Sequence, residues 1–229
     1  MIMVRTYSST IKTVTMTHTF VLFLLIGFIM QSCVTHDINY VVDLSNVESL
    51  NKSKEHIVDF KIINFRLDGM NLCRFEDDNM EIVWRVSRTE FNFELKNKTE
   101  NLIKVNWNDV AYVDINGRVS RMAHKGIKLS ERNSSQPSTV IPKSAVLSDI
   151  LIPTDNIHFT SGKYNSSWSK EPLIPFSYKS HKYRLAAARS NVGKKMSVLM
   201  PIIMEGVQYY YTFEFTVSNI EEKKYTVRH

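Results

Sequence analysis

The sequence has few of the residues that build disulfide-stapled, fibrous or low-complexity proteins. Among 229 residues it has two cysteines, seven glycines and six prolines. Two cysteines exclude a disulfide-dense scaffold and a cysteine-rich zinc or iron–sulfur site. The small numbers of glycine and proline exclude collagen-like and low-complexity chains. Because 43% of the residues are hydrophobic and 11% are aromatic, we expect a folded domain with a real core.

The uncharged apolar run Phe20–Met30 is too short to cross a membrane as a helix. It has eleven residues, whereas a spanning helix needs about 20. No acidic residue precedes Asp37, while Arg5 and Lys12 are basic. A positive leader without acids, followed by a short apolar run, is typical of a secretory signal. We therefore expect residues 1–32 to be a signal peptide.

The apolar run ends in the tetrapeptide Met30-Gln31-Ser32-Cys33. A small residue directly before a cysteine at the end of a signal core resembles the lipobox of bacterial lipoproteins. The loose Ser-Cys form is most similar to lipoproteins of the Bacteroidetes, although Met30 stands where leucine is commoner. The resemblance implies that the leader is cut before Cys33. It also implies that Cys33 is the lipid attachment site and that acyl chains hold the protein in the bacterial cell envelope.

Two alternatives concern the same region. An ordinary signal peptide cut near Ser32 would leave Cys33 free, and a free Cys33 would be expected to pair with Cys73 in an oxidising compartment. In lipoproteins of the Bacteroidetes, a short acidic run after the cysteine resembles a surface-export signal. Here Asp37 is the one acid among the six residues after Cys33. We therefore expect a lipid anchor in the outer membrane that faces the periplasm.

Runs of alternating apolar and polar residues predict strands and hairpins. Phe91–Leu95 and Ile103–Trp107 alternate on either side of a polar cluster, so we expect them to pair as an antiparallel hairpin. Asn116-Gly117 lies between two strand-like runs and is a strong hairpin signal, because both positions tolerate positive φ. The apolar run Val198–Met204 predicts a buried strand, in which Pro201 indicates an edge or a bulge.

These runs predict an all-β domain over residues 55–220. We expect an antiparallel β-sandwich of eight to ten short strands with at most one short helix, near residues 180–190. The segment Phe91–Pro153, with its Ile-Asn-Gly turn and its Val-Ile-Pro-Lys-Ser run, resembles envelope lipoproteins that have an immunoglobulin-like sandwich. The resemblance covers about a third of the chain and implies no activity. Residues 33–54 show no persistent pattern and are expected to be a tether, and residues 221–229 are expected to be a tail.

Sequence motifs for catalysis or metal binding are missing. The histidines show neither the i, i+4 spacing of a helical zinc site nor a His-Glu-x-x-His motif. There is no Gly-x-Ser-x-Gly elbow and no glycine-rich phosphate loop. Cys73, near Leu72 and Phe75, is expected to be a buried thiol rather than a nucleophile. The acidic stretches 76–78 and 114–117 have oxygen ligands for calcium, but we expect a solvated turn and a hairpin turn there. We therefore expect a protein that is not an enzyme and has no cofactor.

The segment 164–195 is the best candidate for ligand binding. Between Ser177 and Lys195 there are six lysines and arginines and no acid. This bias favours an anionic partner such as lipid headgroups or phosphorylated envelope glycans. Aromatic residues in the same segment could form a platform for sugars. The alternatives are a solvated basic loop and aromatic rings that plug one end of the sandwich. The candidate ligand-binding residues are Tyr164, Trp168, Tyr178, Lys179, Lys182 and Arg184.

Together these features predict a membrane-anchored envelope lipoprotein with a non-catalytic binding or scaffolding domain. The alternative is a glycan-binding or anionic-headgroup-binding module that uses residues 164–195. The expected partners are the membrane, through the lipid on Cys33, and an envelope protein or glycan. Nucleic acid is not expected despite the formal net charge of +6, because an exported protein rarely meets it.

Overall fold

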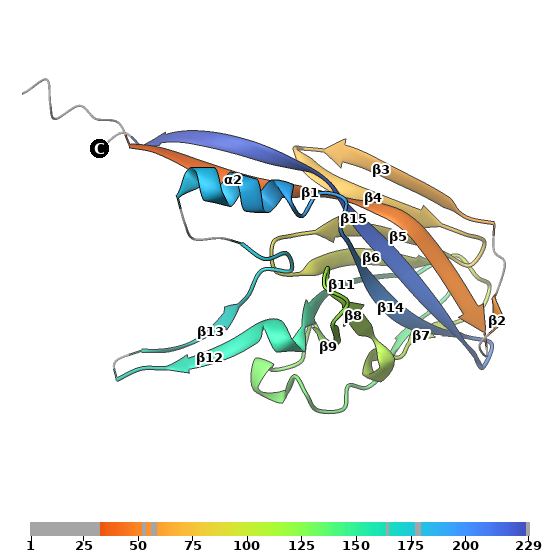
Figure 1. The fold of residues 1–229 in the computed structure, drawn as a ribbon. Helices are drawn as coiled ribbons and strands as arrows, with labels where there is room; N and C mark the ends of the chain where they lie inside the picture. The colour runs from red at the N-terminus through yellow and green to blue at the C-terminus, as the bar shows by residue number, and fades with distance from the viewer. Residues whose placement is uncertain (1–32, 52–53, 56–58, 164, 177–179, 228–229) are drawn as a thin grey trace, which may run out of the picture. The chain divides into compact units, whose positions relative to one another are not determined.

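The computed structural model describes residues 33–51, 54–55, 59–163, 165–176 and 180–227 (Figure 1). The chain divides into two compact units, one made of residues 38–222 and the other of the two terminal segments. The main hydrophobic core lies in the unit 38–222. The expected signal peptide, residues 1–32, lies outside the described residues.

The described residues are mostly β-strand with one α-helix, which confirms the predicted all-β class. They contain fifteen strands, more than the eight to ten expected. The large sheet is built from β1 (Cys33–Asn51), β2 (Lys54–Glu55), β3 (Lys61–Leu67), β4 (Met70–Glu76), β5 (Met80–Val86), β6 (Phe91–Asn97), β7 (Ile103–Val105), β8 (Ala111–Val113), β9 (Val119–His124), β10 (Thr139–Ile141), β11 (Val146–Pro153), β14 (Lys195–Met204) and β15 (Val207–Val227). The other elements are the hairpin β12 (Ile157–Ser161) and β13 (Ser166–Lys170), the helix α2 (His181–Arg189), and the 3-10 helices η1 (Trp107–Asp109), η2 (Leu129–Glu131) and η3 (Thr154–Asn156).

The large sheet is one continuous hydrogen-bonded path. Its order is β2-β1-β15-β14-β8-β9-β11-β6-β5-β4-β3, with β7 joined to β14 and β10 joined to β7. Each strand pair whose register is defined is antiparallel. An immunoglobulin-like sandwich has two sheets that pack face to face. Because hydrogen bonds connect all thirteen strands into one sheet, the immunoglobulin-like sandwich is not confirmed.

The two ends of the path meet, so the sheet is nearly closed. The side-chain amide of Asn64 in β3 makes two hydrogen bonds with the backbone of Leu44 in β1. Its Nδ2 donates to the Leu44 carbonyl at 3.1 Å, and its Oδ1 accepts from the Leu44 N–H at 3.0 Å. Nearby, the Arg66 guanidinium donates to both carboxylate oxygens of Glu221 in β15, at 2.6 and 3.0 Å. Side-chain hydrogen bonds thus lie along the edge of β3, where the backbone of another strand could otherwise pair.

Alternation along the strands places an aromatic core inside this sheet. Trp84, Phe91, Phe213 and Phe215 are fully buried. The ring of Trp84 lies 5.1 Å from that of Phe213 and 5.6 Å from that of Phe215. Such tilted and edge-on aromatic pairs contribute about 0.5–1.5 kcal/mol each beyond the burial of their area. The core therefore joins strands that are far apart in the sequence.

The segment expected to be a tether is instead part of the sheet. Residues Cys33–Asn51 form β1, next to β15 in the strand order. Val42, Leu44 and Val47 are buried in the core. The buried positions change from even to odd residue numbers between Leu44 and Val47, so no single period-two pattern marks the strand. At the other end of the chain, β15 extends to Val227, beyond the domain limit expected at residue 220.

The strands predicted at 91–95 and 103–107 do not pair with each other, so the predicted hairpin is wrong. β6 pairs with β5 and β11, whereas β7 pairs with β10 and β14. The buried side-chain amide of Asn97, the last residue of β6, makes hydrogen bonds with the chain that follows. Its Nδ2 lies 2.7 Å from the carbonyl of Asn101 and 3.1 Å from those of Ile141 and Pro142. These bonds attach the turn to β10 and direct the chain away from β6.

The hairpin predicted at Asn116-Gly117 is confirmed. β8 and β9 pair antiparallel across it. Gly117 has a φ of +80°, which a residue without Cβ adopts at little cost. The Asp114 carboxylate accepts the N–H groups of Asn116 and Arg118 at 2.8 and 2.9 Å. This stretch is a hairpin turn in which the acid bonds its own backbone, as Asx turns do.

Pro201 lies inside β14, at the point where the neighbouring strand changes. β14 pairs with β8 through residues 197–199 and with β7 through residues 202–204. The carbonyl of Pro201 accepts the N–H of Asn106 at 3.1 Å, while the carbonyl of Asn106 accepts the N–H of Asp109 at 3.4 Å. The Asn106 carbonyl therefore needs no N–H donor from position 201. This explains why proline is tolerated here, inside the strand, rather than at the edge or bulge that we expected.

Candidate functional site

The structure divides the predicted ligand-binding segment between two surfaces. Lys182 and Arg184 lie in α2, whereas Trp168 lies in β13 of the separate hairpin. The other candidates, Tyr164, Tyr178 and Lys179, lie outside the described residues. Each of the two surfaces is therefore considered by itself.

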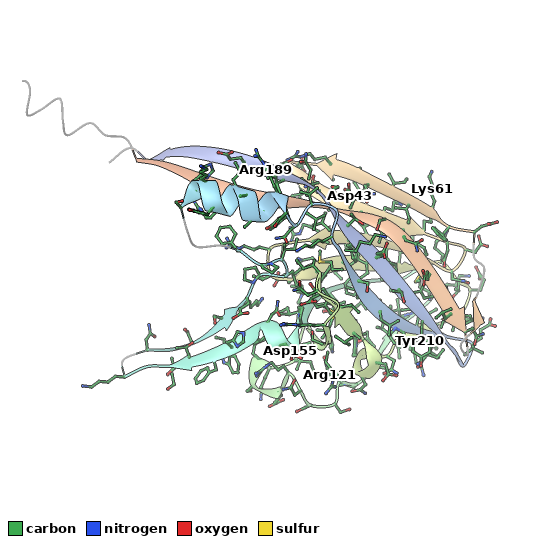
Figure 2. The ribbon with its side chains drawn as sticks, viewed as in Figure 1. Asp43, Lys61, Arg121, Asp155, Arg189 and Tyr210 are labelled. Atoms are coloured by element: carbon green, nitrogen blue, oxygen red, sulfur yellow. The ribbon has the colours of Figure 1, made fainter. Side chains whose placement is uncertain are left out.

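The helix α2 has one face against the sheet and one face toward solvent. Ala188 on the inner face is buried, and His181 Nε2 lies 3.2 Å from Glu222 of β15. In Figure 1 the helix lies next to β1 and β15. The outward face carries two cations and an aromatic ring but no acid, and Arg189 on it is labelled in Figure 2. The exposed helix residues are Lys182, Tyr183, Ala186 and Arg189.

A cavity of about 210 Å³ lies between β1, the turn that follows β5, and the segment 172–176. We call it the Phe176 cavity, after the ring at its mouth. Its walls include Ile38 and Val42 of β1 and Leu173 and Ile174, all of them buried and apolar. A cavity of this size has room for about seven water-sized groups. No acidic residue is among those described residues that line it.

Hydrogen bonds hold the walls of the Phe176 cavity in place. The N–H of Leu173 donates to the carbonyl of Arg88 at 2.9 Å. Tyr40 Oη donates to the Pro175 carbonyl at 3.3 Å and accepts from Nδ2 of the buried Asn191 at 3.0 Å. These bonds connect β1, the turn after β5, the segment 172–176 and Asn191, two residues after α2. The walls of the cavity are therefore joined by hydrogen bonds between segments far apart in the chain.

Two guanidinium groups lie near the ring of Phe176. The Arg88 Cζ atom is 4.4 Å from the ring centroid, and the Arg184 Cζ atom is 5.9 Å from it. Cations within about 6 Å of an aromatic centroid are attracted by the negative face of the ring. Both arginines are thereby held near a ring that lines an apolar cavity, and Arg88 itself lines it. A ligand that has an anionic group attached to an apolar group fits this arrangement.

The second surface is the hairpin β12–β13, which extends away from the large sheet in Figure 1. Phe159 and Trp168 are directly opposite each other and are 53% and 37% exposed. Their ring centroids are 5.0 Å apart with planes tilted by 48°. Arg132 lies 5.3 Å from the Trp168 centroid. Because the rings are tilted and Arg132 lies over one of them, they do not form one flat platform for a sugar.

Sequence reasoning missed Arg88 and Tyr40. Arg88 lies in the turn after β5, outside any basic cluster, and Tyr40 lies in the stretch expected to be a tether. Their roles depend on contacts with Phe176 and Pro175, which are 88 and 135 positions away in the chain. No local pattern marks such contacts.

The acidic stretch 76–78 is neither a cation site nor a solvated turn, because Asp77 is buried. One of its oxygens accepts the N–H groups of Asn79 and Met80 at 2.8 and 2.7 Å. The other accepts the Tyr211 hydroxyl at 3.0 Å. Burial raises the pKa of the Asp77 carboxyl, although these hydrogen bonds act in the opposite direction. The carboxylate is a structural element of the turn between β4 and β5.

Cys73 is a buried thiol, as predicted. It is 1% exposed, and its Sγ lies 3.5 Å from the carbonyl of Val42. Burial raises the pKa of the thiol to about 12. Because the thiolate is the nucleophilic form, this environment does not activate Cys73.

A histidine–aspartate pair lies between β9 and β11. His124 Nδ1 is 3.1 Å from Asp149 Oδ2, and the imidazole is stacked on Trp107 with centroids 4.3 Å apart. Among the described residues, His124 Nε2 has no hydrogen-bond partner. Within this part of the chain, therefore, no serine or cysteine completes a nucleophilic triad with the pair.

No helix among the described residues is long and apolar enough to span a membrane. In this part of the chain, no three His, Cys, Asp or Glu side chains are grouped so that they could hold a metal ion. Comparisons with protein-family models, curated proteins and solved structures find no match.

Proposed function

We propose that this protein is a lipid-anchored envelope lipoprotein whose domain binds anionic lipid headgroups and does not catalyse a reaction. The observation that carries the proposal is the pair of guanidinium groups near the ring of Phe176. Phe176 and Arg88 line an apolar cavity whose described lining contains no acid, and the Arg184 guanidinium lies near the same Phe176 ring. Anionic lipids carry a charged headgroup next to apolar chains. The guanidinium groups could therefore contact the headgroup, and the apolar cavity could contact part of a chain.

The outward face of α2 supports the same proposal. Lys182 and Arg189 are exposed on it, and Tyr183 between them is 64% exposed. Cations near an anionic membrane surface contribute about 1 kcal/mol each. Tyrosine is enriched at membrane interfaces, because its ring is apolar and its hydroxyl is polar. We propose that this face and the mouth of the Phe176 cavity contact headgroups together.

The proposed lipid on Cys33 and the cavity are close in the sequence. Ile38, which lines the cavity, follows Cys33 by five positions. An extended chain of five residues spans at most about 18 Å. Stable anchoring commonly combines acyl chains with a basic patch. On this proposal, the acyl chains retain the protein at the membrane and the basic patch orients the domain on it.

The anchor is tested with Cys33→Ala in the full chain. We expect the protein to move from the membrane fraction to the soluble fraction, or to remain as an unprocessed precursor. Mass spectrometry of the wild-type protein would show the added acyl mass on Cys33. Unchanged membrane association and processing in the variant would contradict the anchor.

Headgroup binding is tested separately, with the chain from residue 33 onward and Cys33→Ser. We expect flotation with vesicles that contain phosphatidylglycerol and none with phosphatidylcholine vesicles. The double variant Lys182→Gln/Arg189→Gln should bind about fivefold more weakly for each lost cation, and Arg88→Gln should also weaken binding. The control is Arg118→Gln/Lys128→Gln, which removes two exposed cations elsewhere. Equal losses in both double variants would indicate attraction by net charge alone and would contradict a specific headgroup site.

A further inference from the structure

A second concave site lies on the outer face of the sheet. It is a groove of about 410 Å³ on β4, β5, β6 and β11, within the range typical of small-molecule sites. We call it the outer groove. None of the described residues that line it lines the Phe176 cavity. The outer groove is therefore independent of the proposed headgroup site.

The floor of the outer groove is apolar, although it faces solvent. Met70, Leu72, Val83 and Ile150 line it, and none of them is buried. On one face of a two-sided sheet, polar residues are the norm where the opposite face holds the core. Exposed apolar groups that are gathered in a groove and rimmed by polar residues indicate an interaction site.

Two hydrogen-bond donor groups lie side by side in this groove. Arg85 and Asn92 are directly opposite each other in β5 and β6, so their side chains are on the same face with Cβ atoms about 4.5–5.5 Å apart. Within the described part of the chain, the one polar contact of the Arg85 guanidinium is with the Met70 sulfur at 3.5 Å. Asn92 Nδ2 is shielded from solvent and has no partner there. A buried donor without an acceptor is costly and rare in native proteins.

The acids of the outer groove are arranged so that they leave these donors unpaired. Asp149 Oδ1 accepts the N–H groups of Lys125 and Ile150, both at 2.7 Å, and Oδ2 faces His124. Glu94 accepts from the Ser148 hydroxyl at 3.4 Å. In the described structure no ion pair joins Glu94 to Arg85.

Lys125, which is exposed, also lines the groove. A bound anion would thus meet a guanidinium and an amide group on an apolar floor. A carboxylate accepts several hydrogen bonds at once and forms two parallel ones with a guanidinium. The apolar floor requires that the carboxylate carry an apolar substituent.

We infer that the outer groove binds a carboxylate that carries an apolar group, with Arg85 and Asn92 holding the carboxylate and the apolar group lying on Met70, Leu72 and Val83. Two sources have this chemistry, an aliphatic fatty acid and the C-terminal residue of a peptide with an apolar side chain. The two sources differ in their expected contact with Glu94. The Glu94 carboxylate can accept a hydrogen bond from the N–H of a peptide, whereas the chain of a fatty acid has no such donor.

The test is an NMR titration of the chain from residue 33 onward with Cys33→Ser, which contains every element that the structure describes. The probes are N-acetyl-leucine, its amide N-acetyl-leucinamide, and isocaproate. We expect N-acetyl-leucine to shift the side-chain NH₂ signals of Asn92 and to bind about tenfold or more tightly than the leucinamide, which lacks the carboxylate. Weaker binding of isocaproate than of N-acetyl-leucine would identify the peptide source, and equal or tighter binding the fatty acid.

Arg85→Gln is the matched variant, and Arg88→Gln, which changes an arginine in the other cavity, is its control. We expect the first to weaken binding of N-acetyl-leucine about tenfold or more and the second to leave it unchanged. The inference is overturned if N-acetyl-leucine and its amide bind equally, or if no Asn92 signal moves. This comparison within the parent protein does not depend on how well Arg85→Gln folds. Loss of vesicle binding in Arg88→Gln with intact N-acetyl-leucine binding would show that the two sites are separate.

Discussion

The side-chain amide of Asn64 pairs with the backbone of Leu44 as a neighbouring peptide group would. It donates to the Leu44 carbonyl and accepts from the Leu44 N–H, at 3.1 and 3.0 Å. Because Asn64 is in β3 and Leu44 in β1, this pair joins one end of the strand path to the strand next to its other end. One side chain therefore contributes directly to the closure of the sheet.

Replacing Asn64 by alanine should destabilise the protein by about 1–2 kcal/mol, the net value of two hydrogen bonds. The measurement is urea-induced unfolding, read from the midpoint and slope of the transition. Asn64→Asp keeps an acceptor and loses the donor, so its effect includes repulsion from the Leu44 carbonyl and should be at least as large. The control Asn133→Ala changes an exposed asparagine and should have little effect. Equal stability of Asn64→Ala and Asn133→Ala would contradict a role of Asn64 in closure.

The buried carboxyl of Asp77 should make stability depend on pH in a recognisable direction. Its pKa is raised in the folded protein, chiefly by burial. The folded state therefore binds the proton more tightly than the unfolded state does. The stability that Asp77 contributes is fully present below its unfolded pKa and is lost as the pH rises through its folded pKa.

Asp77→Asn removes this titration and keeps an oxygen for the backbone N–H groups of Asn79 and Met80. Unfolding free energies of both proteins should be measured from acidic to neutral pH. We expect the unfolding free energy of the wild-type protein to fall relative to that of the variant as the pH rises through the folded pKa of Asp77. Other carboxyl groups titrate in both proteins and cancel in the difference. A difference that is constant over this range, or that changes in favour of the wild-type protein, would show that Asp77 is not stabilised in its protonated form.

The hairpin β12–β13 should open locally when its aromatic pair is removed. An isolated two-stranded hairpin is marginally stable in water, and from His158 to Ser161 and from Ser166 to Lys170 the described residues are exposed. Phe159→Ala or Trp168→Ala removes a pair worth about 0.5–1.5 kcal/mol, so amide exchange in residues 157–170 should accelerate about two- to tenfold. Hydrogen exchange with mass spectrometry measures this effect.

Global unfolding should not change in these variants, because neither ring belongs to the core. Tyr183→Ala, which removes an exposed ring from α2, is the control and should leave exchange in the hairpin unchanged. If a variant lowers the free energy of global unfolding by as much as it lowers the free energy of opening the hairpin, the hairpin is part of the cooperative core. This prediction would then be wrong.

The secondary structure was predictable where local patterns are strong. The Asn-Gly hairpin and the strands β6, β7 and β14 each follow from a turn dipeptide, a period-two alternation or a continuous apolar run within about ten residues. Strand partners were not predictable in the same way. β7 alternates like β6, but the amide of Asn97 binds the carbonyls of Ile141 and Pro142 and attaches the turn to β10. A bond across 44 residues leaves no mark in either local sequence.

The candidate site shows the same division. The bias toward lysine and arginine after residue 176 identified α2 as a cationic surface, since composition is sufficient for that inference. Arg88 and Tyr40 were missed, because each acquires its role through contact with the segment 172–176. The outer groove could not be predicted at all, since Arg85 and Asn92 become neighbours through the register of β5 and β6.

The sequence by itself determined that this is an antiparallel β protein with a leader-like N-terminus and one basic helical segment. Those properties depend on composition and on short periods, which act over a few residues. The tertiary structure alone decided that thirteen strands form one nearly closed sheet, that residues 33–51 form a strand of it, and that the Phe176 cavity and the outer groove have no lining residue in common. These depend on strand register and on side chains such as Asn64, whose hydrogen bonds join residues that the sequence keeps far apart.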